Sequence, residues 1–471
     1  MKKILSLILC CIFLFGCVSC ANEQQEELNL DYNSGINGDV DLDGKHFVFA
    51  MVQDYFFEGA DSTLGFINTT EFADLAAERL RDVQEKHNCT IEFKYVPRAG
   101  DAAYKDVMSG ECTIDIIQDE TYWLLSYVPM GIFVDLTTVD SLDVTDEEKW
   151  GNRYMLYSMM WNGAIYGVLP AQHPLRTQNS MGSVLGINET HVQTLGEVDP
   201  RDYYENGEWT WDTFTRVLTD YNLTSLGGDQ IYALVSSPDR LPMAAAFSNG
   251  GEYITMKSDG TFNLGIFSDE SLEAFNQVSE WINGPTAANI HLDYKDCGRD
   301  YLKAGTAVIG MLDAYQVLSG TDSIAYTLEN FGIVPFPTGP DAEPRSFKSF
   351  YDAADFTLCI PITEPDVEET AFVLDAIYEP FEGYETDEDI IDYLHANYFL
   401  DRRDAEYYYS LSDVEHAYYF PSMDRMYDDI WPPLAEKNPI EVLEAQEESM
   451  YARAEEHLIP RSNTIIEVYG E

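Results

Sequence analysis

The stretch from residue 46 to residue 118 alternates between short apolar strands and amphipathic helices, and this alternation limits the fold more than any other feature. Apolar spacing at periods of two and 3.6 residues predicts strands and helices in turn, over 46–52, 71–87, 91–95, 101–109 and 112–118. Strands that alternate with helices through short connections form parallel βαβ units, with helices on both faces of the sheet. We therefore expect an α/β fold.

The same alternation continues further along the chain with different residues. Apolar patterns predict more strands and helices, over 181–188, 210–221, 231–236, 269–283, 306–312 and 332–336. Residues 364–471 have a mostly helical, acidic and tyrosine-rich pattern. A length of 471 residues fits two or three domains.

The charge of the chain excludes some classes of partner. There are 27 basic and 83 acidic residues, a formal net charge of −56. This charge argues against nucleic acid, because affinity for phosphate depends on Lys and Arg. It also argues against docking on anionic lipid headgroups. Since copies of so acidic a protein repel one another, we expect a soluble monomer.

The first residues have the pattern of an export signal. In 1–16 a basic start precedes an apolar run, 4–15, that is too short to span a membrane. Leu14-Phe15-Gly16-Cys17 resembles a bacterial lipobox, which makes Cys17 the expected lipidation site and Cys20 the alternative. An ordinary cleaved signal with incidental cysteines also stays open. Residues 17–44 are predicted to be a flexible tether, so we expect a lipid-anchored protein on the extracytoplasmic face of a bacterial membrane.

Four cysteines belong to the mature domain: Cys89, Cys112, Cys297 and Cys359. In an oxidising compartment they allow three pairings. Cys89 and Cys112 each begin a predicted strand, so a disulfide between them is one interpretation, and free buried thiols are the other. Because no CxxC pair is present, we expect no metal site.

Signatures of catalysis and of cofactor binding are missing from the sequence. It contains no HExxH and no GxSxG. Asp39, Asp41, Asp43 and Gly44 resemble the start of a calcium loop, but Ala50 stands where such a loop needs a bidentate Glu. We expect no cofactor. A glycosidase-like carboxylate pair stays open, because distance rather than spacing defines it.

Aromatic residues are abundant, with 31 Tyr, 24 Phe and 7 Trp. We expect most of them in the core, including Trp209 and Trp211 beneath their helix. A minority are candidates for stacking on sugar rings, whose hydroxyls suit carboxylates, amides and Arg.

Five segments support a specific family. They are AIYGVLP (164–170), GEWTWDTF (207–214), AAAFSNGGEYI (244–254), YLKAGTAVIGML (301–312) and FGIVPFPTGP (331–340). In content, order and spacing they resemble segments of the ABC-transporter extracellular solute-binding proteins, family 1, a mostly carbohydrate-binding lipoprotein branch. The resemblance covers nearly the whole chain from residue 45. The Tyr-rich stretch 380–430 departs from the compact members.

The resemblance implies a two-lobed α/β fold of the type II periplasmic-binding-protein kind, with a hinge and an interlobe cleft. The implied crossings between the lobes lie near 168–172, 302–305 and 350–355. On this basis we expect lobe one to comprise 45–169 and 302–350, and lobe two to comprise 170–301 and 351–471.

Ligands of open α/β sheets bind outside the carboxyl ends of the strands. Strand ends and crossings therefore supply the candidate ligand-binding residues, and in similar proteins such positions provide stacking rings and hydroxyl-binding groups. The candidates are Gln53, Asp54, Tyr55, Asp119, Glu120, Tyr122, Trp123, Gln172, His173, Arg176, Asp239, Arg240, Asp313, Tyr315, Tyr351, Asp352, Asp424 and Arg425.

The function that the resemblance implies is a lipid-anchored receptor that binds a small polar solute, a mono- or oligosaccharide, and delivers it to the permease subunits of an ABC importer. Binding proceeds by hinge closure and breaks no bond. Two other classes stay open: a surface glycan-binding lipoprotein of helical-repeat build, and a lipid-anchored glycoside hydrolase. The residues do not identify the solute.

Overall fold

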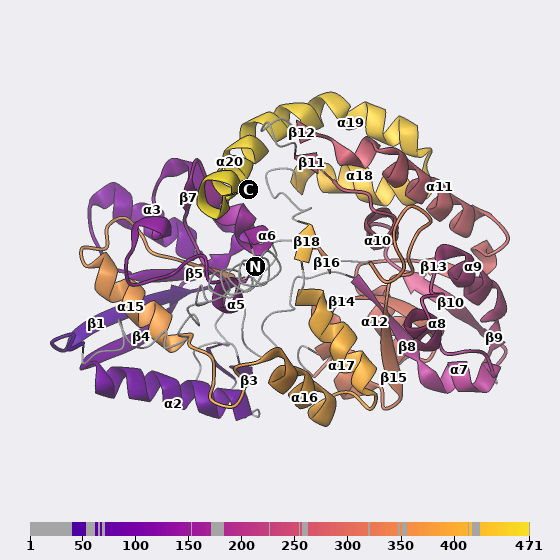
Figure 1. Cartoon of the computed structure of the whole chain (residues 1–471), viewed down its shortest axis with the longest axis horizontal. Helices are drawn as coiled ribbons and strands as arrows, with labels where there is room; N and C mark the ends of the chain where they lie inside the picture. The colour runs from indigo at the N-terminus through magenta and orange to yellow at the C-terminus, as the bar shows by residue number, and fades with distance from the viewer. Residues whose placement is uncertain are drawn as a thin grey trace, which may run out of the picture.

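The structure is a computed structural model of the chain. It describes residues 40–52, 62–64, 66–67, 71–151, 153–170, 183–225, 227–253, 255–256, 262–318, 321–346, 349–350, 356–412, 414–416 and 424–470. The fold contains two separate main sheets, which Figure 1 shows on its left and right sides.

The first sheet has four strands in the order β17-β5-β1-β4. Their bounds are Lys45–Met51 for β1, Cys89–Tyr95 for β4, Ile116–Glu120 for β5 and Phe356–Cys359 for β17. Strand β1 runs parallel to β4 and to β5, whereas β17 is antiparallel to β5. The parallel βαβ units predicted before residue 120 are therefore confirmed.

Strand β1 sends alternate side chains into two cores, as a strand buried on both faces does. Phe47 and Phe49 belong to the core that includes Phe72 of helix α2 (Glu71–Lys86). Ala50 belongs to a smaller core with Ala103 of helix α3 (Ala99–Ser109). The two helices therefore cover opposite faces of the sheet.

Strand β5 begins four residues later than predicted, at Ile116 rather than Cys112. The carboxylate of Asp106 accepts hydrogen bonds from the Thr113 backbone N–H and hydroxyl, at 2.8 and 2.7 Å. Asp115 accepts a bond of 2.6 Å from the Val48 backbone N–H. These side-chain bonds hold 112–115 as a loop, which apolar spacing alone does not reveal.

The second sheet runs β13-β10-β14-β8-β15, with β9 paired to β10. The bounds are Ser183–Asn188 (β8), Leu223–Thr224 (β9), Gln230–Ser236 (β10), Ile290–Leu292 (β13), Ala307–Asp313 (β14) and Phe331–Pro335 (β15). Strand β10 is parallel to β13 and β14, and β8 is antiparallel to β14 and β15. Its helices are α7 (Glu189–Leu195), α8 (Pro200–Glu205), α9 (Trp211–Asp220), α10 (Arg240–Ser248), α11 (Asp269–Asn283), α12 (Cys297–Lys303), α13 (Ala314–Leu318) and α14 (Ile324–Thr327).

The expected assignment of 302–350 to lobe one is wrong. Strands β14 and β15 pair within the second sheet, with β10 and β8. Helix α12, which leads into β14, packs on β10, β14 and β8 of the second sheet, and it approaches β14 so closely that a Cβ at Gly310 would lie 2.5 Å from the Gly298 carbonyl oxygen. The connection 304–306 is a short helix-to-strand turn rather than a crossing between sheets.

The assignment of all of 351–471 to lobe two is also wrong. Strand β17 completes the first sheet, and the helix after it, α15 (Val367–Ile377), packs on α2. Helices α17 (Arg402–Tyr409), α18 (Asp424–Glu436) and α19 (Pro439–Arg453) pack on the second sheet or its helices, and α16 (Asp387–Asn397) packs on α17. The last helix, α20 (Ile459–Tyr469), returns to strand β6 (Met160–Trp161) near the first sheet (Figure 1).

Smaller elements complete the two sides. Two-residue strands form four separate pairs: β2 (Ser62–Thr63) with β3 (Phe66–Ile67), β6 with β7 (Ala164–Ile165), β11 (Thr255–Met256) with β12 (Phe262–Asn263), and β16 (Ser349–Phe350) with β18 (Val414–His416, three residues). Short helices are α4 (Thr121–Leu124), α5 (Glu147–Trp150) and α6 (Arg153–Leu156). None of the helices in the described ranges has both the length and the apolar character that a bilayer-spanning helix needs.

Two sequence interpretations are settled by the packing. Trp209 and Trp211 are buried, and their indole N–H groups donate to the Pro335 carbonyl and the Ser248 hydroxyl, at 2.9 and 3.2 Å. Their predicted place in the core is therefore confirmed. All four cysteines of the mature domain are free thiols, so the structure contains no disulfide between Cys89 and Cys112.

Candidate functional site

The chain passes between the two sheets at the edges where parallel strands end. After β7 it enters the second sheet at Ser183, which lies opposite Asp313 at the end of β14. On its return it enters the first sheet at Phe356, which lies opposite Glu120 at the end of β5. These two strand ends are therefore the edges that the chain connects, and ligands of α/β sheets bind at such edges.

Gln118, the middle residue of β5, has the most unusual side chain of this strand. It is 0 % exposed, and neither its amide nitrogen nor its amide oxygen has a hydrogen-bond partner among the described residues. In the sheet it lies between Met51 of β1 and Leu358 of β17. An unpaired buried amide costs about 1–3 kcal/mol, so Gln118 is a candidate to bind a group beyond the described residues, either of the chain or of a solute.

Asp119 has a structural role near the end of β5. One carboxylate oxygen accepts from the Gly100 N–H at 2.9 Å, and the other accepts from the Glu120 N–H at 2.8 Å. The first of these bonds satisfies a free donor in the first turn of α3. Burial raises the pKa of the Asp119 carboxyl, and the two backbone N–H groups oppose that rise.

Trp123 offers an aromatic surface on the short helix that follows β5. The Arg98 guanidinium lies 4.1 Å from the centroid of its ring, a cation–π contact. The Tyr122 ring lies 4.8 Å away, edge to face. Trp123 is nevertheless 40 % exposed, so it has ring surface left for a ligand.

Arg240 and Asp313 form a buried ion pair in the second sheet. A guanidinium nitrogen of Arg240, the first residue of α10, lies 2.9 Å from a carboxylate oxygen of Asp313, the last residue of β14. Their side chains are only 6 % and 8 % exposed. The charge of Arg240 is therefore compensated within the protein.

A second polar group surrounds Tyr315 on α13. Its hydroxyl donates to Asp296 at 2.8 Å, and the Gln316 amide donates to the same oxygen at 2.7 Å. The Gln316 amide oxygen accepts from the Asp313 N–H at 2.9 Å, which joins this group to the end of β14. Burial, followed by the Asp296 carboxylate, raises the pKa of the Tyr315 hydroxyl, so this hydroxyl stays protonated.

The structure places the described candidates in two groups. Asp119, Glu120, Tyr122 and Trp123 follow one another along the end of β5 and the start of α4, and Asp239, Arg240, Asp313 and Tyr315 lie at the ends of β10 and β14. Asp424 and Arg425 are the first residues of α18, and the structure describes only their helical backbone. The other candidates lie outside the described residues: Gln53, Asp54, Tyr55, Gln172, His173, Arg176, Tyr351 and Asp352, together with the lipidation candidates Cys17 and Cys20.

Sequence reasoning missed four polar residues of these two groups, namely Arg98, Gln118, Asp296 and Gln316. Gln118 carries a signal, because it is a polar residue at the end of an apolar run. The spacing nevertheless predicts a strand over 112–118, and the candidate residues begin only after it, at Asp119. Asp296 and Arg98 had no such signal, since their partners Tyr315 and Trp123 are contacts of the folded chain.

Comparison with known proteins gives the family. The model for bacterial extracellular solute-binding proteins matches residues 78–376. No curated protein matches the chain closely enough in sequence to count as a relative.

Solved structures share the fold. The cyclic α-maltosyl-1,6-maltose binding protein of Arthrobacter globiformis has a TM-score of 0.61 at 12% identity, over 87% of this chain and 98% of that one. The GacH receptor of Streptomyces glaucescens, solved unliganded and with acarbose, has a TM-score of 0.58 at 11% identity, over 88% and 99%. UgpB of Mycobacterium tuberculosis, in complex with glycerophosphocholine, has a TM-score of 0.56 at 15% identity, over 82% and 96%. The chain therefore has the two-lobed, periplasmic-binding-protein-like fold.

Proposed function

The chain belongs to the bacterial extracellular solute-binding proteins, and from that premise we propose that it is the lipid-anchored receptor of an ABC importer for a neutral mono- or oligosaccharide. It binds the sugar between its two lobes, passes it to the permease subunits and performs no chemistry on it. The proposed anchor is Cys17, with Cys20 as the alternative. The receptor acts as a monomer on the extracytoplasmic face of the membrane.

The observation that carries this proposal is that β5 and the short helix after it supply both an exposed aromatic ring and a buried amide without a partner among the described residues. Trp123 presents a ring on which an apolar sugar face can stack. Gln118 presents one donor group and one acceptor that no described residue satisfies, and both suit sugar hydroxyls. Two of the structural neighbours, the receptors from Arthrobacter globiformis and Streptomyces glaucescens, bind sugars or sugar-like molecules.

Charge at the second sheet favours a neutral solute. Arg240 is paired with buried Asp313, so its positive charge is already balanced. The chain as a whole has a net charge of −56, which repels anions. A neutral sugar needs no free positive charge in the site, and the negative charge of the chain does not repel it.

The proposed motion is closure of the two lobes around the sugar. With the strand pairing above, we assign 40–169, 356–377 and 459–469 to lobe one and 183–346 and 387–453 to lobe two. A solute that contacts both lobes stabilises the closed form by its additional contacts there. The permease would then distinguish the closed receptor from the open one.

A thermal-shift screen with a Trp123→Ala variant tests this proposal. Neutral sugars, including maltose and maltotetraose, anionic sugars and amino acids are added to the purified mature protein. We expect a neutral sugar to raise the melting temperature by mass action. The Trp123→Ala variant should keep the circular dichroism of the parent and lose most of the shift, because the stacking surface is gone.

Tyr451→Ala is the matched control, since Tyr451 is 41% exposed on α19, away from the strand ends. It should keep the full shift. An equal shift in Trp123→Ala and the parent would remove Trp123 from the site. If only anions or amino acids raised the melting temperature, the assignment of a neutral sugar would be overturned. If the sugar were recovered in cleaved form, the protein would be a glycoside hydrolase rather than a receptor.

A further inference from the structure

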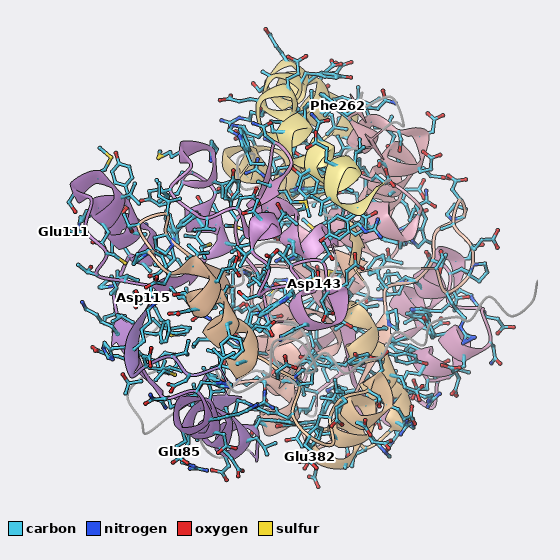
Figure 2. All side chains as sticks on the ribbon, turned by 60° about the vertical axis from the view of Figure 1, so that its left-hand side comes forward. Glu85, Glu111, Asp115, Asp143, Phe262 and Glu382 are labelled. Atoms are coloured by element: carbon cyan, nitrogen blue, oxygen red, sulfur yellow. The ribbon has the colours of Figure 1, made fainter. Side chains whose placement is uncertain are left out.

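Three metal-ligating side chains converge at the edge of the first sheet opposite the proposed sugar site. Cys112 and Asp115 lie on the loop before β5, and Glu364 lies between β17 and α15. One ligand atom from each lies within 4.8 Å of the others. Figure 2 shows Asp115 on this side of the molecule, between Glu111 and helix α15.

The distances within this group fit a tetrahedral ion. The Cys112 sulfur lies 3.5 Å from Glu364 Oε2 and 3.7 Å from Asp115 Oδ1. A zinc ion with bonds of about 2.3 Å to sulfur and about 2.1 Å to oxygen separates such ligands by roughly 3.5 Å. Little movement is therefore needed to place an ion among the three atoms.

Backbone groups orient both carboxylates. The second oxygen of Asp115 accepts from the Val48 N–H at 2.6 Å, and the second oxygen of Glu364 accepts from the Asp366 N–H at 3.0 Å. Each carboxylate therefore has one oxygen fixed by the fold and the other turned toward the Cys112 sulfur. Such outer contacts hold ligands in position in metal sites.

A buried hydroxyl lies beside Glu364. Thr370 is 0 % exposed, and its Oγ1 has no hydrogen bond of ordinary geometry within the described part of the chain. It lies close enough to the Glu364 carboxyl to act on it, since it lowers the pKa of that group. The Thr370 hydroxyl is therefore directed at the Glu364 carboxyl from the buried side.

The two carboxyls and the thiol lie close enough to affect one another's protonation. Burial, followed by the Asp115 carboxyl, raises the pKa of Glu364 to about 7. Burial, followed by the charges of Glu364 and Asp115, raises the pKa of the Cys112 thiol to about 12. No described Lys, Arg or His forms an ion pair with either carboxylate.

We propose that Cys112, Asp115 and Glu364 form a Zn²⁺ site that ties the loop before β5 to the segment before α15. On binding, the Cys112 thiol loses its proton to solvent, and the thiolate and the two carboxylates bind the ion. The mixture of thiolate and carboxylate ligands suits zinc better than magnesium or calcium. Cys112 is exposed, which gives the ion a way in and leaves a position for water.

Titration of the full-length mature protein with ZnCl₂ tests the site. The protein is first reduced and treated with a chelator, and millimolar Mg²⁺ is added to occupy surface carboxylates. We expect one Zn²⁺ per chain and a higher melting temperature. Cys112→Ser and Glu364→Gln should each weaken binding by at least about tenfold, the loss that even an outer contact causes. Glu111→Gln, an exposed carboxylate on the same loop, should bind like the parent.

Titration with Cd²⁺ identifies the sulfur ligand directly. A thiolate bound to Cd²⁺ gives an ultraviolet charge-transfer band, which we expect in the parent and in Glu111→Gln but not in Cys112→Ser. The Cys112→Ser change is at an exposed side chain, so loss of folding does not explain a lost band. Absence of the band from the parent, or equal Zn²⁺ affinity in the parent and Cys112→Ser, would overturn the site and leave an ordinary thiol hydrogen bond.

Discussion

Replacement of Gln118 by methionine is expected to stabilise the solute-free protein and to weaken its binding of the solute. Methionine has nearly the same length, and it removes a buried amide whose two polar atoms have no described partner. The free energy of unfolding should rise by about 1–3 kcal/mol, the usual cost of an unsatisfied buried polar group. Affinity for the sugar should fall by about tenfold, the equivalent of about 1.4 kcal/mol.

Urea unfolding and calorimetric titration of the same samples measure these two effects. Gln193→Met serves as the control, because Gln193 is an exposed residue of α7 and should change neither quantity. A residue with only a structural role is not expected to make the protein more stable and its binding of the sugar weaker when it is replaced. A more stable variant with unchanged affinity would mean that Gln118 does not contact the solute, and a less stable variant would mean that its amide has a partner within the folded chain.

Removal of Arg240 alone is expected to be the most destabilising of the changes considered. Arg240→Met leaves Asp313 buried with its main counter-charge gone. Breaking a buried pair in this way typically costs about 3–5 kcal/mol. The double variant Arg240→Met, Asp313→Leu should recover most of the loss, because replacement of both partners by apolar groups is often close to neutral.

Urea unfolding of the two single variants and the double variant gives the coupling between the partners. A double variant as unstable as Arg240→Met would show that Arg240 acts through other contacts. The same variants test the neutral-solute proposal. If Arg240 instead bound an anionic solute, the Asp313→Leu variant would show higher affinity for anionic sugars than the parent.

The helices and strands could largely be predicted from the sequence because their signals are local. Helix α9 follows from an apolar face and from Thr210, whose hydroxyl accepts from the Thr213 N–H at the start of the helix. Helix α3 ends at Gly110, which has the left-handed conformation that glycine tolerates. Both features lie within a few residues of the element that they define.

The partners of these elements could not be predicted in the same way. Strand β14 is apolar from Ala307 to Leu312 and buried throughout, so its pattern fits either sheet equally well. Its place between β10 and β8 is set by pairing across the sheet, where Gly310 lies opposite Val235 of β10 and Gly186 of β8. The return of β17, α15 and α20 to the first sheet likewise depends on pairing between distant segments, as does the convergence of Cys112 with Glu364.

Small-angle X-ray scattering of the mature protein with and without a sugar that raises its melting temperature tests the central claim most directly. If the two lobes close around the sugar, the radius of gyration should decrease on saturation, and the sugar should be recovered with unchanged mass. A radius of gyration that is the same with and without saturating sugar would contradict closure.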